Sequence, residues 1–201
     1  MMSLRTTSLL LLTWLALGAP LGANTVLFSN FPANNGPFLG MPGSWVHAQG
    51  FTPSTDALLA QISVKIAMEP AGTAVIDLRD DNAGSPGNVI ESFTAPAFQM
   101  NGSIVTLDSV LHPLLLTSTL YWVTFTDNAS DPNTRIYWAW NDALQLGNYR
   151  YSLDGGETWR SDTGFQNVQT ALEVTGTPEP GTLVLLGLPL IGLGLLRFRH
   201  A

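Results

Sequence analysis

Residues 60–69 alternate strictly between apolar and mostly polar side chains. The first series is Ala60, Ile62, Val64, Ile66 and Met68. Because successive side chains of a strand point to opposite faces, this pattern predicts a strand with one buried face. Residues 74–79 repeat the alternation after the turn signal Pro70-Ala71-Gly72, so we expect the two segments to form a hairpin.

The remainder of residues 24–176 consists of short apolar runs separated by Gly, Pro, Asn and Asp. Further strands are predicted at 25–29, 45–51, 89–93, 103–108, 120–126, 135–140, 148–153, 159–161 and 171–175. Residues 30–43 are expected to be a loop and residues 54–59 a helical turn. Regularly spaced short strands predict an all-β fold, with residues 24–176 as a single β-sandwich (jelly-roll-like) domain.

Composition excludes several classes of protein. The chain has no cysteine, so neither disulfides nor thiolate metal sites are possible. Its net charge is −7, and no basic patch is present to neutralise phosphates, so nucleic acid is not an expected partner. Only 11% of the residues are charged, against about 25% in ordinary globular proteins.

The first 23 residues have the three parts of a secretory signal peptide. Arg5 provides a positive charge, residues 9–17 are apolar, and residues 19–23 end in small side chains. We expect cleavage after Ala23, because Pro20 would obstruct cleavage after Ala19. The rest of the chain is therefore expected to be exported.

The last 25 residues, 177–201, combine a Pro-rich turn, an apolar run and an arginine cluster. As a helix at about 1.5 Å per residue, residues 181–196 would be about 24 Å long, a marginal span for a hydrocarbon core of about 30 Å. Three glycines and Pro189 weaken that helix further. Arg197 and Arg199 are expected to remain on the cytoplasmic side of a membrane.

Thr177-Pro178-Glu179-Pro180-Gly181, followed by the apolar run and Arg197-Phe198-Arg199-His200, resembles the C-terminal sorting signal of PEP-CTERM proteins. These are exported surface proteins of exopolysaccharide-producing Gram-negative bacteria. The resemblance implies that Pro178, Glu179, Pro180, Arg197 and Arg199 form a sorting signal. It also implies an exosortase-type membrane enzyme as processing partner. The alternative is a simple C-terminal membrane anchor with a Pro-rich neck.

Several short motifs of the central region resemble the choice-of-anchor domains, type R in particular. They are Phe51-Thr52, the strand at residues 62–68, the loop at residues 80–87, Leu120-Tyr121-Trp122-Val123, and Tyr151-Ser152 before Asp-Gly-Gly-x-Thr-Trp. The resemblance implies a β-rich module that occurs together with surface-anchoring tails. It implies no activity.

Residues 152–159 match the Asp-box pattern Ser-x-Asp-x-Gly-x-Thr-Trp. The matching residues are Ser152, Asp154, Gly156, Thr158 and Trp159. We expect a structural hairpin in which the Asp accepts hydrogen bonds from the turn backbone, the glycines supply positive φ, and the Trp packs beneath. This motif resembles the Asp boxes that recur in sialidase propellers. Such propellers carry several copies, whereas this chain has one.

Asp77, Asp80, Asp81 and Asn82 place four oxygen-bearing side chains close together in the sequence, and hard oxygen ligands suit Ca²⁺. Their spacing differs from that of an EF-hand. A tight turn explains the same residues without a metal. Calcium binding and a simple turn are both left open, and no other cofactor is expected.

Aromatic residues supply a third candidate site. Trp138 and Trp140 should share one face of a strand, beside Asn and Asp residues, and exposed rings of this kind stack on sugars. The alternative is that the rings pack the core. His47 and His112 lie in no nucleophile or zinc motif, and no spacing selects a pair of catalytic carboxylates.

The sequence therefore predicts an exported, non-catalytic protein, tethered through its C-terminal segment and then present at the cell surface or in the extracellular matrix, with a structural or adhesive role. The alternatives are a carbohydrate-binding module that holds the protein on exopolysaccharide and, third, a glycoside-processing enzyme.

Overall fold

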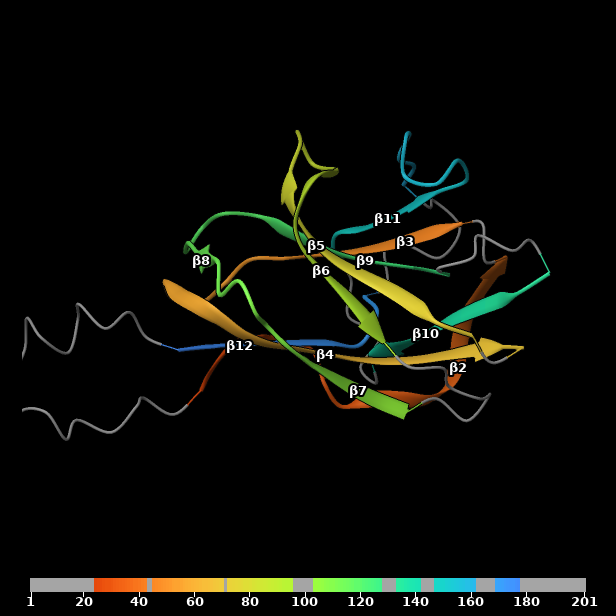
Figure 1. Ribbon diagram of the computed structural model, residues 1–201, viewed down its shortest axis with the longest axis horizontal. Helices are drawn as coiled ribbons and strands as arrows, with labels where there is room; N and C mark the ends of the chain where they lie inside the picture. Colours follow the sequence, from red (N-terminus) through yellow and green to blue (C-terminus); the bar gives the residue numbers. More distant parts are fainter. Residues whose placement is uncertain are drawn as a thin grey trace, which may run out of the picture.

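The computed structural model describes residues 24–42, 45–70, 72–95, 103–127, 133–141, 147–161 and 169–177. These residues form two antiparallel sheets packed face to face, which confirms the predicted all-β sandwich (Figure 1). The predicted signal peptide, residues 1–23, and all of the predicted tail after Thr177 lie outside the described residues.

The larger sheet has seven strands. They are β1 (Thr25–Ser29), β2 (Ala33–Pro42), β4 (Ala57–Glu69), β7 (Ser103–Asp108), β8 (Leu114–Leu115), β10 (Arg135–Asn141) and β12 (Leu172–Thr177). The long strand β4 lies at its centre. β12 pairs with its first half and β10 with its second half, while β8 and β7 pair with it as well.

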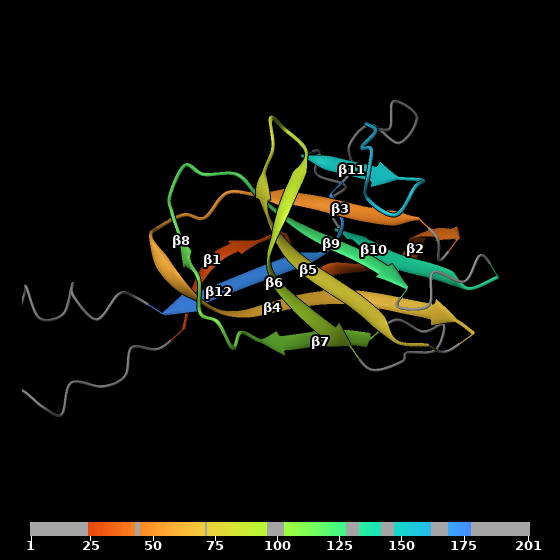
Figure 2. The same ribbon diagram turned by 45° about the horizontal axis from the view of Figure 1, so that its top comes forward.

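The smaller sheet has five strands in the order β11-β3-β9-β5-β6. Their bounds are β3 (Val46–Phe51), β5 (Ala74–Asp81), β6 (Pro86–Ala95), β9 (Tyr121–Asp127) and β11 (Tyr149–Ser152). The two layers are also visible in the turned view (Figure 2).

The core lies between the sheets and follows the alternation seen in the sequence. β4 contributes Ile62, Val64, Ile66 and Met68, and β5 contributes Ala74, Ile76 and Leu78. All seven side chains are buried. The period-two pattern was therefore a correct guide to the buried face of each strand.

The predicted hairpin between residues 60–69 and 74–79 was wrong. β4 belongs to the larger sheet, whereas β5 belongs to the smaller sheet and pairs with β6 and β9. The turn after Glu69 carries the chain from one layer to the other. Since both strands have one strongly apolar face, they bury those faces across the core instead of pairing side by side.

Three other local predictions were wrong. Residues 33–42 form β2 instead of a loop, because they pair with β10 at the edge of the sheet, where proline is tolerated; Pro37 falls at the irregularity in that pairing. Residues 57–59 begin β4 instead of a helical turn, since they pair with β8 and β12. The strand predicted at 159–161 is a single bridge between Tyr151 and Arg160.

The chain enters and leaves the sandwich at one end. Thr25, the first residue of β1, pairs with Gly176, and the next residue, Thr177, pairs with Leu58 of β4. We call this the near end; β8 lies there too, as Figures 1 and 2 show. The opposite end, where β4 finishes at Glu69, is the far end.

Candidate functional site

Four aromatic side chains gather toward the far end, beneath the edge strand β11. Tyr149 is buried, and Trp45, Trp140 and Tyr151 pack against it while half-buried. The rings of Trp45 and Tyr151 are stacked, with centroids 5.9 Å apart and planes inclined by 21°. We call these four residues the aromatic cluster.

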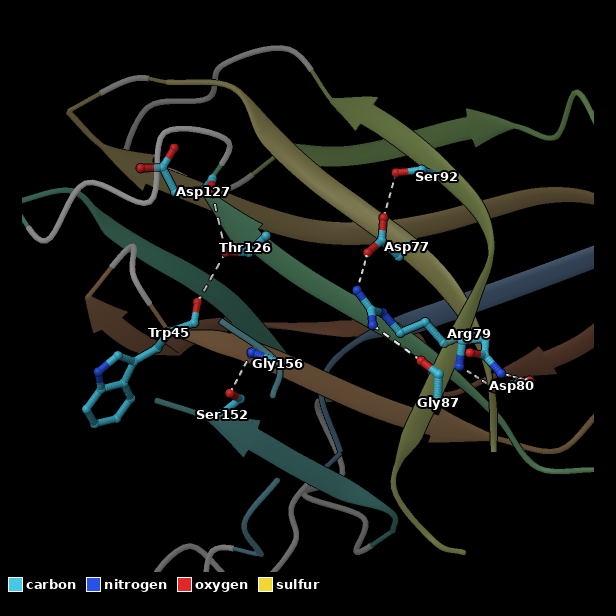
Figure 3. Close-up of polar contacts among 11 residues, drawn as sticks. Trp45, Asp77, Arg79, Asp80, Gly87, Ser92, Thr126, Asp127, Ser152 and Gly156 are labelled. Carbon is cyan, nitrogen blue, oxygen red and sulfur yellow. Dashed lines mark hydrogen bonds and ion pairs between the residues drawn. The ribbon is translucent and has the colours of Figure 1, made fainter. Parts of the chain in front are cut away.

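Strand register explains why the cluster forms. Tyr149 and Tyr151 are two residues apart on β11 and pair with Gln49 and His47 of β3. Because paired residues of antiparallel strands lie on the same face, these two tyrosines point between the sheets together with buried Gln49 and His47. Trp45 precedes β3, and its backbone carbonyl accepts a 3.4 Å hydrogen bond from Thr126 Oγ1 (Figure 3). Trp140 belongs to β10 of the other sheet, where its backbone forms an isolated β-bridge with Thr170.

His47 supports the cluster from inside. Its ring is fully buried, its Nδ1 lies 2.8 Å from the hydroxyl of Tyr149, and it stacks at 6.4 Å on Phe125. Burial lowers the pKa of His47 to about 3. The imidazole is therefore neutral at pH 7, and it positions a tyrosine instead of acting as an exposed base.

Gln49 fixes the adjoining backbone. Its Oε1 accepts a 2.8 Å hydrogen bond from the amide of Thr170, and its Nε2 donates to the carbonyls of Gly50 and Asn148 at 2.9 and 3.0 Å. The side chain is fully buried. It thereby joins the segment that precedes β12, in one sheet, to the edge of the other sheet beneath the aromatic cluster.

The Asp-box residues form a tight hairpin directly after β11. Ser152 Oγ donates to Asp154 Oδ1 at 2.6 Å and accepts from the amide of Gly156 at 2.7 Å, as Figure 3 shows for the second contact. Asp154 Oδ1 accepts from the amide of Thr158 at 2.9 Å. Hydrogen bonds from Ser152 and Thr158 hold the pKa of Asp154 well below its usual value.

Backbone conformation explains the glycines of this hairpin. Gly155 and Gly156 have φ of 74° and 99°, which residues with a side chain rarely adopt. A Cβ at position 156 would lie 3.6 Å from the ring of Trp159, so the half-buried indole packs beneath the turn. Tyr151 and Arg160 exchange backbone hydrogen bonds of 2.8 and 3.0 Å that close the hairpin next to the aromatic cluster.

Trp138 does not belong to the surface, and the prediction of an exposed ring was wrong for this residue. Its side chain is fully buried, packs edge-on against Phe125 at 6.0 Å, and donates from Nε1 to the carbonyl of Ala171 at 2.9 Å. Trp140 lies on the same face of β10 but at the margin of the core. The sequence identified one of the three half-exposed rings; Trp45 and Tyr151 were missed, because their proximity depends on the pairing of β3 with β11.

The acidic loop residues do not converge on one point. Asp77 pairs with Arg79 at 2.7 Å and accepts from Ser92 at 2.6 Å, as shown in Figure 3. Asp80 accepts from the backbone and side chain of Asn88. Asp81 Oδ1 accepts from Trp122 Nε1 at 2.8 Å.

The same loop ends in a two-residue turn. Ala83 and Gly84 have φ of 52° and 83°, and Asn82 and Ser85 exchange backbone hydrogen bonds across them. Asp81 also accepts from the amide of Gly84 at 3.1 Å. Within the described ranges, no group of three or more His, Asp or Glu side chains is arranged to hold a metal ion. These contacts are those of a turn.

No model of a known protein family matches the chain, and no curated protein matches it. Among the residues that the structure describes, no helix is long and apolar enough to cross a membrane. Pro178, Glu179, Pro180, Arg197 and Arg199 lie outside the described residues, so the sorting signal stays a prediction from sequence.

Proposed function

We propose that this chain is an exported bacterial surface protein whose β-sandwich is a non-catalytic structural or adhesive module. The supporting observation is that Thr25 and Thr177 lie at the same end of the sandwich. The predicted export signal and the predicted sorting tail thus attach to the near end. A module held there presents its far end, with the aromatic cluster, away from the membrane.

The sequence features of the two ends complete the proposal. Residues 1–23 direct export, and residues 177–201 tether the protein to the membrane until an exosortase-type enzyme processes it near Pro178-Glu179-Pro180. We also infer a jelly-roll-like choice-of-anchor sandwich, which is supported by antiparallel pairing of strands distant in sequence, such as β1 with β12. Neither nucleic acid nor a cofactor has a part in this proposal, and it contains no catalytic step.

Intact mass spectrometry of protein recovered from the surface or medium of the host tests the sorting step. We expect a mass that lacks residues 1–23 and the segment after the Pro-Glu-Pro turn. Replacing Glu179 by Ala should leave the full tail in place, whereas Glu157→Ala, an exposed acid of the Asp-box hairpin, should leave processing unchanged. A wild-type mass that still includes Arg197–Ala201 would reduce the tail to a simple anchor.

We propose binding of exopolysaccharide as a second candidate function, because the aromatic cluster supplies stacked, half-buried rings. Trp45 and Tyr151 stack at 5.9 Å, and Trp140 packs with them around buried Tyr149. Apolar ring faces next to polar backbone suit the alternating apolar and hydroxyl-bearing surfaces of sugars. His47 holds the Tyr149 hydroxyl and Gln49 holds the surrounding backbone from within, so the base of the cluster is fixed before a ligand arrives.

Retention on exopolysaccharide from the host tests this second function. Trp45→Ala and Trp140→Ala should each weaken retention of the protein. Tyr137→Ala is the matched control, since Tyr137 is a half-buried aromatic on the opposite face of the same strand as Trp140. Equal retention of all three variants and the wild type would exclude the aromatic cluster as a sugar site. That result would leave the sorting proposal intact.

A further inference from the structure

An apolar loop projects from the near end. Residues 109–119 connect β7 to β9, and four of their apolar side chains are exposed: Val110 by 81%, Leu111 by 66%, Leu114 by 43% and Leu116 by 44%. We call residues 109–119 the apolar loop. Soluble proteins rarely gather so many exposed aliphatic residues in one short segment unless the segment contacts a partner.

A buried carboxylate fixes the base of the apolar loop. Glu91 of β6 is 4% exposed and accepts hydrogen bonds from Ser109 Oγ at 2.6 Å and from the amides of Val110 and Leu111 at 2.6 and 3.1 Å. Burial alone would raise the pKa of Glu91, but these three hydrogen bonds and nearby His112 lower it, with a net decrease. The carboxylate thus stays charged and holds the Val110 and Leu111 backbone in place.

Further contacts hold the remainder of the loop. His112 has φ of 46°, its Nδ1 lies 2.9 Å from the carbonyl of Leu59, and Leu115 is fully buried. Leu116 donates its amide to the Tyr121 hydroxyl at 3.1 Å, and Thr117 donates its amide to Asp56 at 2.6 Å. The exposed side chains therefore belong to a supported structure, and their exposure is a property of the fold.

The apolar loop lies close to the point at which the chain leaves the sandwich. β8 pairs with Ala57 and Leu58 of β4 on one side, and the end of β12 pairs with Leu58 on the other. With about 4.8 Å between neighbouring strands, Leu114 and Thr177 lie about 10 Å apart. Four residues, 178–181, separate Thr177 from the apolar run that begins at Thr182, so these two residues lie at most about 18 Å apart.

We propose that Val110, Leu111, Leu114 and Leu116 insert into the surface of a lipid bilayer when the protein is tethered through its C-terminal segment. This inference rests on the proposed membrane tether. The short connection holds the apolar loop at the height of the headgroups, where aliphatic side chains gain by leaving water. The net charge of −7 favours a zwitterionic over an anionic lipid surface.

Because the chain has no cysteine, one probe can be placed at will. Full-length protein with Leu111→Cys, labelled with an environment-sensitive fluorophore, is reconstituted into phosphatidylcholine vesicles that carry a lipid-bound quencher. Val110→Cys is a second site in the loop. Ile104→Cys is the matched control, since Ile104 is 59% exposed and lies on β7 beside Lys65, toward the far end.

We expect blue-shifted emission and severalfold quenching at positions 110 and 111, and neither change at position 104. Vesicle-bound protein whose probes at 110 and 111 are as unquenched as the probe at 104 would overturn this inference alone. Failure of the wild-type chain to float with vesicles would overturn both this inference and the membrane tether. Self-quenching at position 111 in detergent without lipid would assign the loop to a second copy of the chain instead.

Discussion

The two ends of the sandwich use buried polar groups in opposite ways. At the near end, the charged carboxylate of Glu91 binds backbone amides and holds apolar side chains out toward solvent. At the far end, the neutral imidazole of His47 binds a tyrosine hydroxyl and holds aromatic rings inward. One group is stabilised in its charged form and the other in its neutral form, so acid should weaken each end over a different pH range.

The largest expected effect is acid destabilisation through His47. Its folded pKa of about 3 lies below the unfolded value of 6.5, so the unfolded chain binds the extra proton between these values. Stability should fall as pH drops below 6.5, approaching about 1.4 kcal/mol per pH unit and reaching about 4–5 kcal/mol near pH 3. Urea unfolding at several pH values measures this loss.

The matched variant for this prediction is His47→Gln, which keeps a polar partner for Tyr149 but does not titrate. Its free energy of unfolding should change much less between pH 6.5 and 5 than that of the wild type. Parallel curves for the two proteins would show that His47 is not the group responsible.

The second prediction concerns the near end. Glu91→Ala leaves the Ser109 hydroxyl and two amides without their acceptor, and we expect a loss of about 3 kcal/mol in unfolding free energy. Because the pKa of Glu91 is lowered, its contribution is present above its unfolded pKa of 4.5 and is lost as pH falls through the folded value.

Amide hydrogen exchange at Val110 and Leu111 should accelerate in Glu91→Ala and accelerate less in Glu91→Gln, which retains one acceptor oxygen. If the two amides exchange at wild-type rates in Glu91→Ala, the carboxylate does not hold the loop.

The third prediction tests the hairpin beside the aromatic cluster. Ser152 is fully buried, and Ser152→Ala removes the acceptor of the Gly156 amide, at a cost of about 2 kcal/mol. Ser63→Ala removes a hydroxyl contact with Thr106 on the sheet surface and should change stability by less than about 0.5 kcal/mol. Thermal unfolding compares the two; equal shifts would refute a special role for Ser152.

The smallest effect is expected in the apolar loop. Val110→Ser with Leu111→Ser should alter the unfolding free energy of the detergent-solubilised protein by less than about 0.5 kcal/mol, because neither side chain packs in the core. Leu115→Ala, a neighbour that is fully buried, should cost about 2–5 kcal/mol. A large loss in the double variant would mean that the exposed side chains serve stability and not contact with a partner.

Local sequence patterns predicted the strands whose own alternation is strong, such as β4, β7 and β12. They did not predict β2, because Gly36, Pro37 and Gly40 favour a loop and only pairing with β10 makes the segment extended. They also did not separate Trp138 from Trp140. Two residues on one face have the same periodicity, and the edge of the core is set by Thr170 and Ala171, far along the chain.

The Asp-box hairpin was predictable in detail because its contacts lie within eight consecutive residues, 152–159. The aromatic cluster was not, since it joins β10 and β11, from different sheets, with Trp45, which precedes β3. The apolar loop was missed as well. Its sequence reads as an ordinary apolar stretch, and only burial of Leu115 beside exposed Leu114 and Leu116 distinguishes it.

The pairing of β12 has a mechanical consequence. This strand lies between β1 and β4, and its last residue is the point at which the chain leaves the sandwich. When Thr177 is pulled while the far end is held, the force acts parallel to β12. We therefore expect the hydrogen bonds on both sides of β12 to share the force instead of breaking one after another. Single-molecule stretching between Thr177 and the Asp-box hairpin should therefore give a higher rupture force than pulling β12 sideways away from β4.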